Sequence, residues 1–126
     1  MNEVKFLDVK GEKIPALFDL NVVAELQEKY GSLSEWNAKC FPEGSEPRLK
    51  PLIHAFELSI NEGYDAIGSD KRVTNAEAGR IVTAMTIDKA AAKIKQLVVD
   101  STKSGDGEKN APSPTTENQP DSISNG

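Results

Sequence analysis

The sequence contains very few of the residues from which catalytic and metal sites are usually built. Among its 126 residues there is one cysteine, Cys40, and one histidine, His54. A single cysteine excludes a disulfide within the chain, and we interpret Cys40 as a structural thiol. His54 shares a predicted helix face with Lys50 and Glu57, and nothing nearby indicates an oriented catalytic partner. No phosphate-binding loop or triad motif is present, so we expect a protein that is not an enzyme and uses no metal or cofactor.

Long apolar runs and clusters of basic residues are also missing. No run approaches the ~20 apolar residues that span a bilayer, and the first ten residues carry charges where a signal peptide has an apolar stretch. The formal net charge is −5. An acidic chain with scattered basic residues binds phosphates poorly, which also argues against a DNA-binding helix-turn-helix at VTNAEAGRIVTAM. We therefore expect a cytoplasmic protein that binds neither nucleic acid nor a membrane.

The composition changes near residue 100. From residue 101 onward the sequence is STKSGDGEKNAPSPTTENQPDSISNG, whose only large apolar residue is an isoleucine. Such a stretch cannot bury enough surface to offset the entropy cost of ordering it. The sequence thus predicts a folded domain over residues 1–100 and a disordered polar tail over residues 101–126.

The predicted domain is organised around a helix between Arg48 and Gly63. Its apolar residues recur at helical spacing and share one face: Leu49, Leu52, Ile53, Phe56 and Ile60. Gly63 tolerates positive φ and is interpreted as the helix stop. Leu58 points away from this face, which suggests a helix covered on more than one side.

The other segments predict a mainly α (α+β) fold, with an N-terminal β-hairpin packed on a compact bundle of four to five helices. Two short apolar runs, residues 4–9 and 14–18, flank KGEK, where Gly11 suits a tight turn. Alternation in the second run predicts one buried face. Helix starts are predicted by N-cap residues at Asp19, Ser32 and Thr74, the last two with a glutamate three residues later.

Two apolar sets lie between Thr74 and residue 100 without an intervening glycine or proline. Projected on one continuous helix, the set containing Ile81 faces away from the set containing Ile94 and Leu97. Either the chain turns at residues 86–88, which is the prediction we favour, or one long helix exposes its second half. Leu58, on the back of the central helix, and the set Ile94, Leu97 and Val98 are the candidates for binding a partner. The alternative is that they pack on the hairpin and on the Trp36 helix.

Four features in this order resemble the tail assembly chaperones of long-tailed phages and prophages of Gram-positive bacteria. A hairpin precedes FDLNVVAELQEKYGSLSEW; a central helix then ends in INEGYD, and VTNAEAGRIV comes before a polar tail. The resemblance covers about residues 4–100. It implies a non-enzymatic protein that binds the tape-measure protein during tail assembly, keeps its helical segments in solution and helps recruit tail-tube subunits. It also implies that a longer, frameshifted form can exist.

Two other functions remain open at this point. One is a different phage or bacterial helical interaction module, such as a head–tail connector or a small regulator. Self-association of the chain is a further possibility for either function. A gene position just before a very long tape-measure gene would favour the chaperone. The other is an enzyme, which would require a pocket that brings His54 together with ionisable neighbours of shifted pKa.

Overall fold

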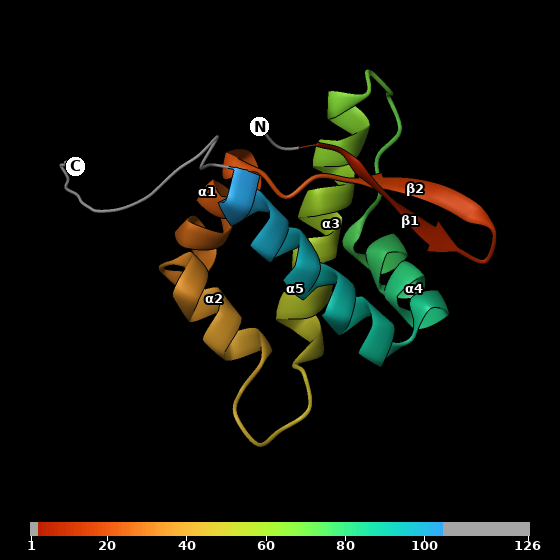
Figure 1. Cartoon of the computed structure of the whole chain (residues 1–126). Helices are drawn as coiled ribbons and strands as arrows, with labels where there is room; N and C mark the ends of the chain where they lie inside the picture. Colours follow the sequence, from red (N-terminus) through yellow and green to blue (C-terminus); the bar gives the residue numbers. More distant parts are fainter. Residues whose placement is uncertain (1–2, 105–126) are drawn as a thin grey trace, which may run out of the picture.

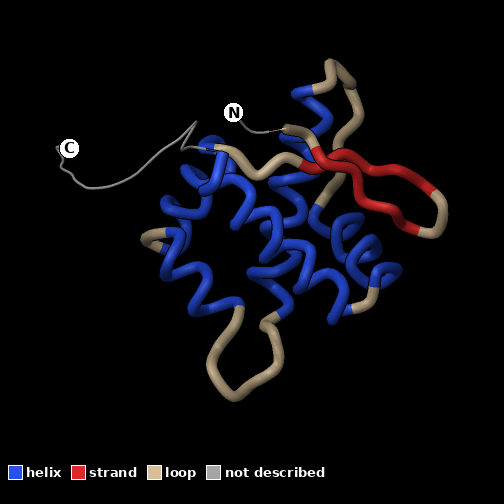
Figure 2. The backbone as a smooth tube through the Cα atoms, in the orientation of Figure 1, coloured by secondary structure: helices blue, strands red, loops and turns tan. Residues whose placement is uncertain are grey.

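The computed structural model describes residues 3–104, which form an α+β fold with an N-terminal hairpin and five helices (Figures 1 and 2). The elements are β1 (Lys5–Val9), β2 (Glu12–Ala16), α1 (Leu20–Tyr30), α2 (Leu33–Cys40), α3 (Leu49–Ala66), α4 (Asn75–Met85) and α5 (Ile87–Ser104). This architecture confirms the predicted fold class. The predicted disorder of residues 105–126 lies outside the described residues.

The hairpin is closed by the turn that the sequence predicts. Leu7 pairs with Ile14 in an antiparallel register, and Lys10 and Gly11 connect the strands at φ of 51° and 84°. Two successive residues at positive φ match the right-handed twist of a two-residue hairpin. The predicted single buried face is wrong, however, because residues 14–18 are all buried. The hairpin lies against α3, where the Leu17 amide donates to the Ser59 carbonyl at 2.9 Å.

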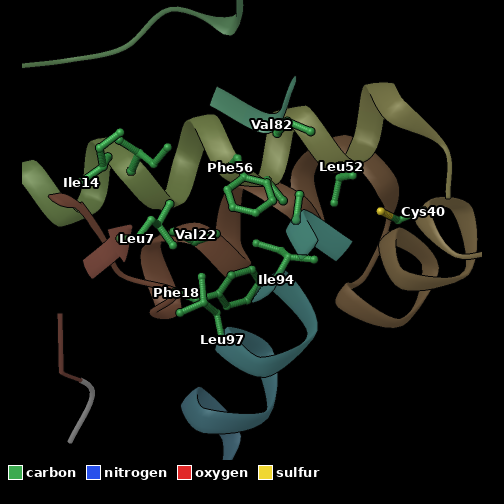
Figure 3. Close-up of a cluster of buried hydrophobic side chains, with 14 of the residues drawn as sticks. Leu7, Ile14, Phe18, Val22, Cys40, Leu52, Phe56, Val82, Ile94 and Leu97 are labelled. Carbon is green, nitrogen blue, oxygen red and sulfur yellow. The ribbon is translucent and has the colours of Figure 1, made fainter. Parts of the chain in front are cut away.

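Helix α3 is the centre of the molecule, as predicted. It contacts β2, α1, α2, α4 and α5. Leu52, Phe56 and Ile60 are 0% exposed, and Figure 3 shows Phe56 within the cluster that joins the other elements. The helical spacing therefore identified the core face correctly over the middle of this helix.

The predicted role of Gly63 is wrong, because α3 continues past it to Ala66. Gly63 is buried, and a Cβ at this position would lie 2.7 Å from the Pro15 carbonyl carbon and 2.7 Å from the Ala16 nitrogen. Such distances to backbone atoms are not compatible with a side chain. Gly63 is needed because the helix and β2 approach each other closely here, not because a helix has to end.

Gly63→Ala should therefore lower the free energy of unfolding by about 1–3 kcal/mol, since the hairpin must move to admit one methyl group. Urea denaturation measures this loss. Gly79→Ala is the matched control in the middle of α4, where the new Cβ would meet Ile53 Cδ1 at an ordinary 3.6 Å. That change should raise stability by roughly 0.5–1 kcal/mol through helix propensity. Equal effects at the two glycines would contradict the close approach.

The chain turns between α4 and α5 at Thr86, which has a φ of 80° and a ψ of 152°. The Thr86 amide donates to the Val82 carbonyl at 2.9 Å, and its own carbonyl accepts from the Ala90 amide at 2.9 Å. One helix thus ends and the next begins at this residue. The predicted turn at residues 86–88 is confirmed, and the continuous helix is wrong.

This turn corrects two of the predicted partner-binding residues. Ile94 is 0% exposed and Leu97 is 3% exposed, and both belong to the central cluster (Figure 3). With α5 folded back on α3, these side chains pack inside the monomer and cannot reach a partner. Val98 is half-buried and packs against the same cluster. The helix also runs to Ser104, four residues beyond the predicted boundary of the folded part.

Candidate functional site

An apolar groove lies where the first turn of α3, the middle of α4 and the start of α5 meet. It encloses about 350 Å³ and is lined by Leu49, Ile53, Gly79, Val82, Thr83, Thr86 and Ile87. Val82 is buried and Ile53 half-buried, whereas Leu49 is 45% and Ile87 41% exposed. Two large apolar side chains thus remain in water on either side of an apolar hollow. We call this surface the α3–α4–α5 groove.

The groove continues past the start of α3 into a second hollow of about 450 Å³. The two hollows share Leu49 and Ile87. The remaining lining residues come from the end of the loop before α3 and from its first turn: Glu46, Pro47, Arg48, Lys50 and Pro51. The surface is therefore apolar at its centre and carries charged side chains only at this end.

The N-terminus of α3 lacks the stabilising groups found at other helix starts. Asp19, Ser32 and Thr74 each accept a backbone N–H of the helix that follows. At α3 the capping position is occupied by Arg48, which makes no such bond, and the first turn contains no acidic residue. A guanidinium has no hydrogen-bond acceptor, so Arg48 cannot cap the helix. Because the first turn also lacks an acidic residue, no negative side chain there offsets the positive end of the helix dipole.

Leu58 lies in a different cleft, between α1 and α3. The cleft encloses about 390 Å³ and is lined by Asn21, Val22, Ala24, Glu25, Glu57, Leu58, Asn61, Glu62 and Arg72. Asn21 donates to Glu62 at 2.8 Å, and Asn75 donates to Glu57 at 3.0 Å. A hydrogen bond with the Asp19 carboxyl raises the pKa of Glu62, although the Asn21 amide opposes this effect. The cleft is acidic, although Val22 and Ala24 also line it, and Leu58 itself is half-buried against the core. The partner-binding role of Leu58 stays a prediction.

Neither His54 nor Cys40 lines any of the three hollows described above. Cys40 is fully buried, and burial raises the pKa of its thiol to about 12, although Lys95 acts in the opposite direction. It is thus a protonated structural thiol at neutral pH, as the sequence predicts. His54 is half-buried, with its Nδ1 3.3 Å from the Tyr30 hydroxyl.

Burial, with a smaller contribution from the charge of Lys29, lowers the pKa of His54 below its ordinary 6.5, while Glu57 and Glu25 oppose the shift. The unfolded chain therefore binds a proton at a higher pH than the folded chain. Stability should fall as the pH is lowered through 6.5 towards the folded-state pKa, and His54→Gln should remove this part of the pH dependence.

Urea denaturation of both chains at a series of pH values, from about 7.5 down to about 5, covers the range in which histidine titrates and measures the effect. The glutamine variant is the control for the carboxylates, which titrate in both chains. An identical pH dependence in the two chains would contradict a depressed histidine pKa.

Sequence spacing placed Leu49 on the buried face of the central helix, and the structure corrects this. Leu49 has the correct angular position, but it lies in the first turn, where the neighbouring elements no longer cover the helix. Ile87 and Thr86 were recognised only as part of a possible turn. The prolines at positions 47 and 51 indicate where α3 can begin, but they do not indicate that its first turn is exposed.

No protein-family model, curated protein or solved structure matches the chain. Among the helices of residues 3–104, none is both long and apolar enough to cross a membrane. Within the described part of the chain, no three His, Cys, Asp or Glu side chains are grouped so that they could hold a metal ion. The α3–α4–α5 groove is the surface whose chemistry points most clearly to a partner.

Proposed function

We propose that the protein is a non-enzymatic tail assembly chaperone of a long-tailed phage or prophage, acting in the cytoplasm of the bacterial host. It binds an apolar helical segment of the tape-measure protein and helps to recruit tail-tube subunits. The identity of the partners rests on the resemblance of residues 4–100 to that family. The observation that supports a binding role is the α3–α4–α5 groove.

The groove suits a chaperone for helices because it offers uncovered apolar surface without exposing the core. A helix that docks in a groove inserts side chains from one face, at spacings of three and four residues. Leu49 and Ile87 form the two exposed walls, and Val82 lies on the buried floor. Leu49 and Ile87 line both hollows, so a helix that fills the groove covers these two exposed side chains together.

The test is retention of the co-expressed tape-measure protein by the full chain. Leu49→Ser combined with Ile87→Ser should weaken binding by roughly tenfold or more, because two apolar side chains no longer become buried. Phe6→Ser is the matched control, since Phe6 is 50% exposed on β1 and does not line the groove. Melting curves of all three chains check that each variant is folded.

Unchanged retention by a folded Leu49/Ile87 variant would reject the groove as the chaperone site. Equal loss in the Phe6 variant would show that the binding is nonspecific adsorption to apolar surface. If the wild-type chain does not bind the tape-measure protein at all, the proposed function is wrong.

A further inference from the structure

The charged side chains that line the α3–α4–α5 groove all lie at one end of it. Arg48 and Lys50 flank Leu49 at the start of α3, and Glu46 is the only acidic residue that lines either hollow. Ion pairs elsewhere in the described part of the chain join Lys5 to Glu3, Lys13 to Asp8 and Arg72 to Asp65. Neither Arg48 nor Lys50 takes part in one, so both cations are available at the end of the groove.

The backbone of α3 adds to this positive character. The first N–H groups of a helix have no intrahelical partner and carry the positive end of the helix dipole. In α3 only the N–H groups of Leu49 and Lys50 remain, because Pro51 has none and the Arg48 amide donates to the Cys40 carbonyl at 2.8 Å. The capping side chain offers them no acceptor, and the first turn contains no acidic residue. Helix α5 begins beside the same groove, but its first turn contains Asp88. Arg48 and Lys50 outnumber Glu46 in the hollow at the α3 end, so this is the end of the groove at which an anion would be most stable.

The second cleft has the opposite character. Glu25, Glu57 and Glu62 line it, and its one cation, Arg72, is paired with Asp65 at 3.0 Å. An acidic segment is repelled from that cleft and attracted to the α3 end of the groove. The two surfaces therefore discriminate between segments by charge, although each contains apolar side chains.

We infer that the segment bound in the α3–α4–α5 groove is an amphipathic helix with carboxylates beside its apolar stripe, placed so that they meet Arg48, Lys50 and the start of α3. This inference rests on the proposed function and specifies the chemistry of its partner. The apolar stripe supplies most of the binding free energy by burying Leu49 and Ile87. The carboxylates fix the direction and register of the helix, because the positive groups lie at one end of the groove only.

The test uses three designed peptides with the same leucine stripe and with glutamate, glutamine or lysine at the flanking positions. Each is about 20 residues long, so that it can be helical in isolation. The full chain should bind the glutamate peptide about tenfold more tightly than the lysine peptide at low salt, from two surface ion pairs and the helix dipole. Raising the salt concentration should reduce this preference, because exposed charges are screened.

The chain carrying Arg48→Glu and Lys50→Glu should reverse the order of the glutamate and lysine peptides. Glu25→Lys combined with Glu57→Lys in the Leu58 cleft is the matched control, and it should leave the preference for glutamate unchanged. Reversal by the first variant alone supports the inference. Three outcomes would overturn it: none of the peptides binds, all three bind equally, or the control variant also reverses the order.

Failure of this inference can be separated from failure of the proposed function. Equal binding of all three peptides, abolished by Leu49→Ser, would keep the groove as a chaperone site and reject only the acidic partner. Light scattering of the chain without peptide tests a second copy as the occupant. A dimer that Leu49→Ser dissociates would overturn the inference, whereas a monomer leaves the groove free for the acidic helix.

Discussion

Phe56→Ala should lower the free energy of unfolding by about 3–5 kcal/mol, a large part of the stability of a domain of this size. Phe56 is 0% exposed and lies in the cluster to which α1, α2, α5 and the hairpin all contribute (Figure 3). Removing the ring loses its burial and leaves a cavity that rigidly packed neighbours fill only in part. Urea denaturation at fixed pH measures the change.

Leu49→Ala is the matched control for this substitution. It removes a large apolar side chain from the same helix, but at a position that is 45% exposed. The loss should stay below about 1 kcal/mol, within the usual range for surface changes. A loss of that small size at Phe56 would show that the core face of α3 had been assigned wrongly. A stable Leu49 variant also ensures that weakened partner binding cannot be attributed to unfolding.

The sequence was most informative where structure is determined by neighbours along the chain. The N-cap residues Asp19, Ser32 and Thr74 all start the predicted helices, and Thr74 forms a complete capping box with Glu77. These signals depend on residues within about one helical turn, so a single sequence contains them in full. The turn at Lys10 and Gly11 was predictable for the same reason.

The sequence was less informative where distant segments meet. By local rules Gly63 is a favourable helix stop. In the structure, however, a glycine is needed there because any side chain would clash with the backbone of residues 15 and 16, more than forty positions away. Nothing within one turn of Gly63 indicates that approach. The groove was missed in the same way, since spacing gives the face on which Leu49 lies but not how far the neighbouring elements extend along the helix.

The two apolar sets after Thr74 show both situations at once. Their phase difference is a local property and indicated correctly that one straight helix would expose one of the sets. The phase difference does not say whether the chain turns so that both sets are buried. That outcome depends on Thr86, which adopts a positive φ. A threonine carries no strong signal for such a conformation, so only the packing of α5 against α3 and α4 decides the question.

The position of α5 leads to the second large expected effect. Leu97→Ala should lower the free energy of unfolding by about 2–5 kcal/mol, because Leu97 is 3% exposed and belongs to the central cluster. Val99→Ala is the matched control on the same helix, where the side chain is 44% exposed and the loss should be within about 0.5 kcal/mol.

If α5 instead continued straight from α4, Leu97 would be exposed and its substitution would leave the melting temperature unchanged while weakening partner binding. The Leu97→Ala chain should lose much stability, while its folded fraction still binds the tape-measure protein. That result would leave the α3–α4–α5 groove as the binding surface. A stable Leu97 variant that no longer binds would restore the end of α5 as the partner site.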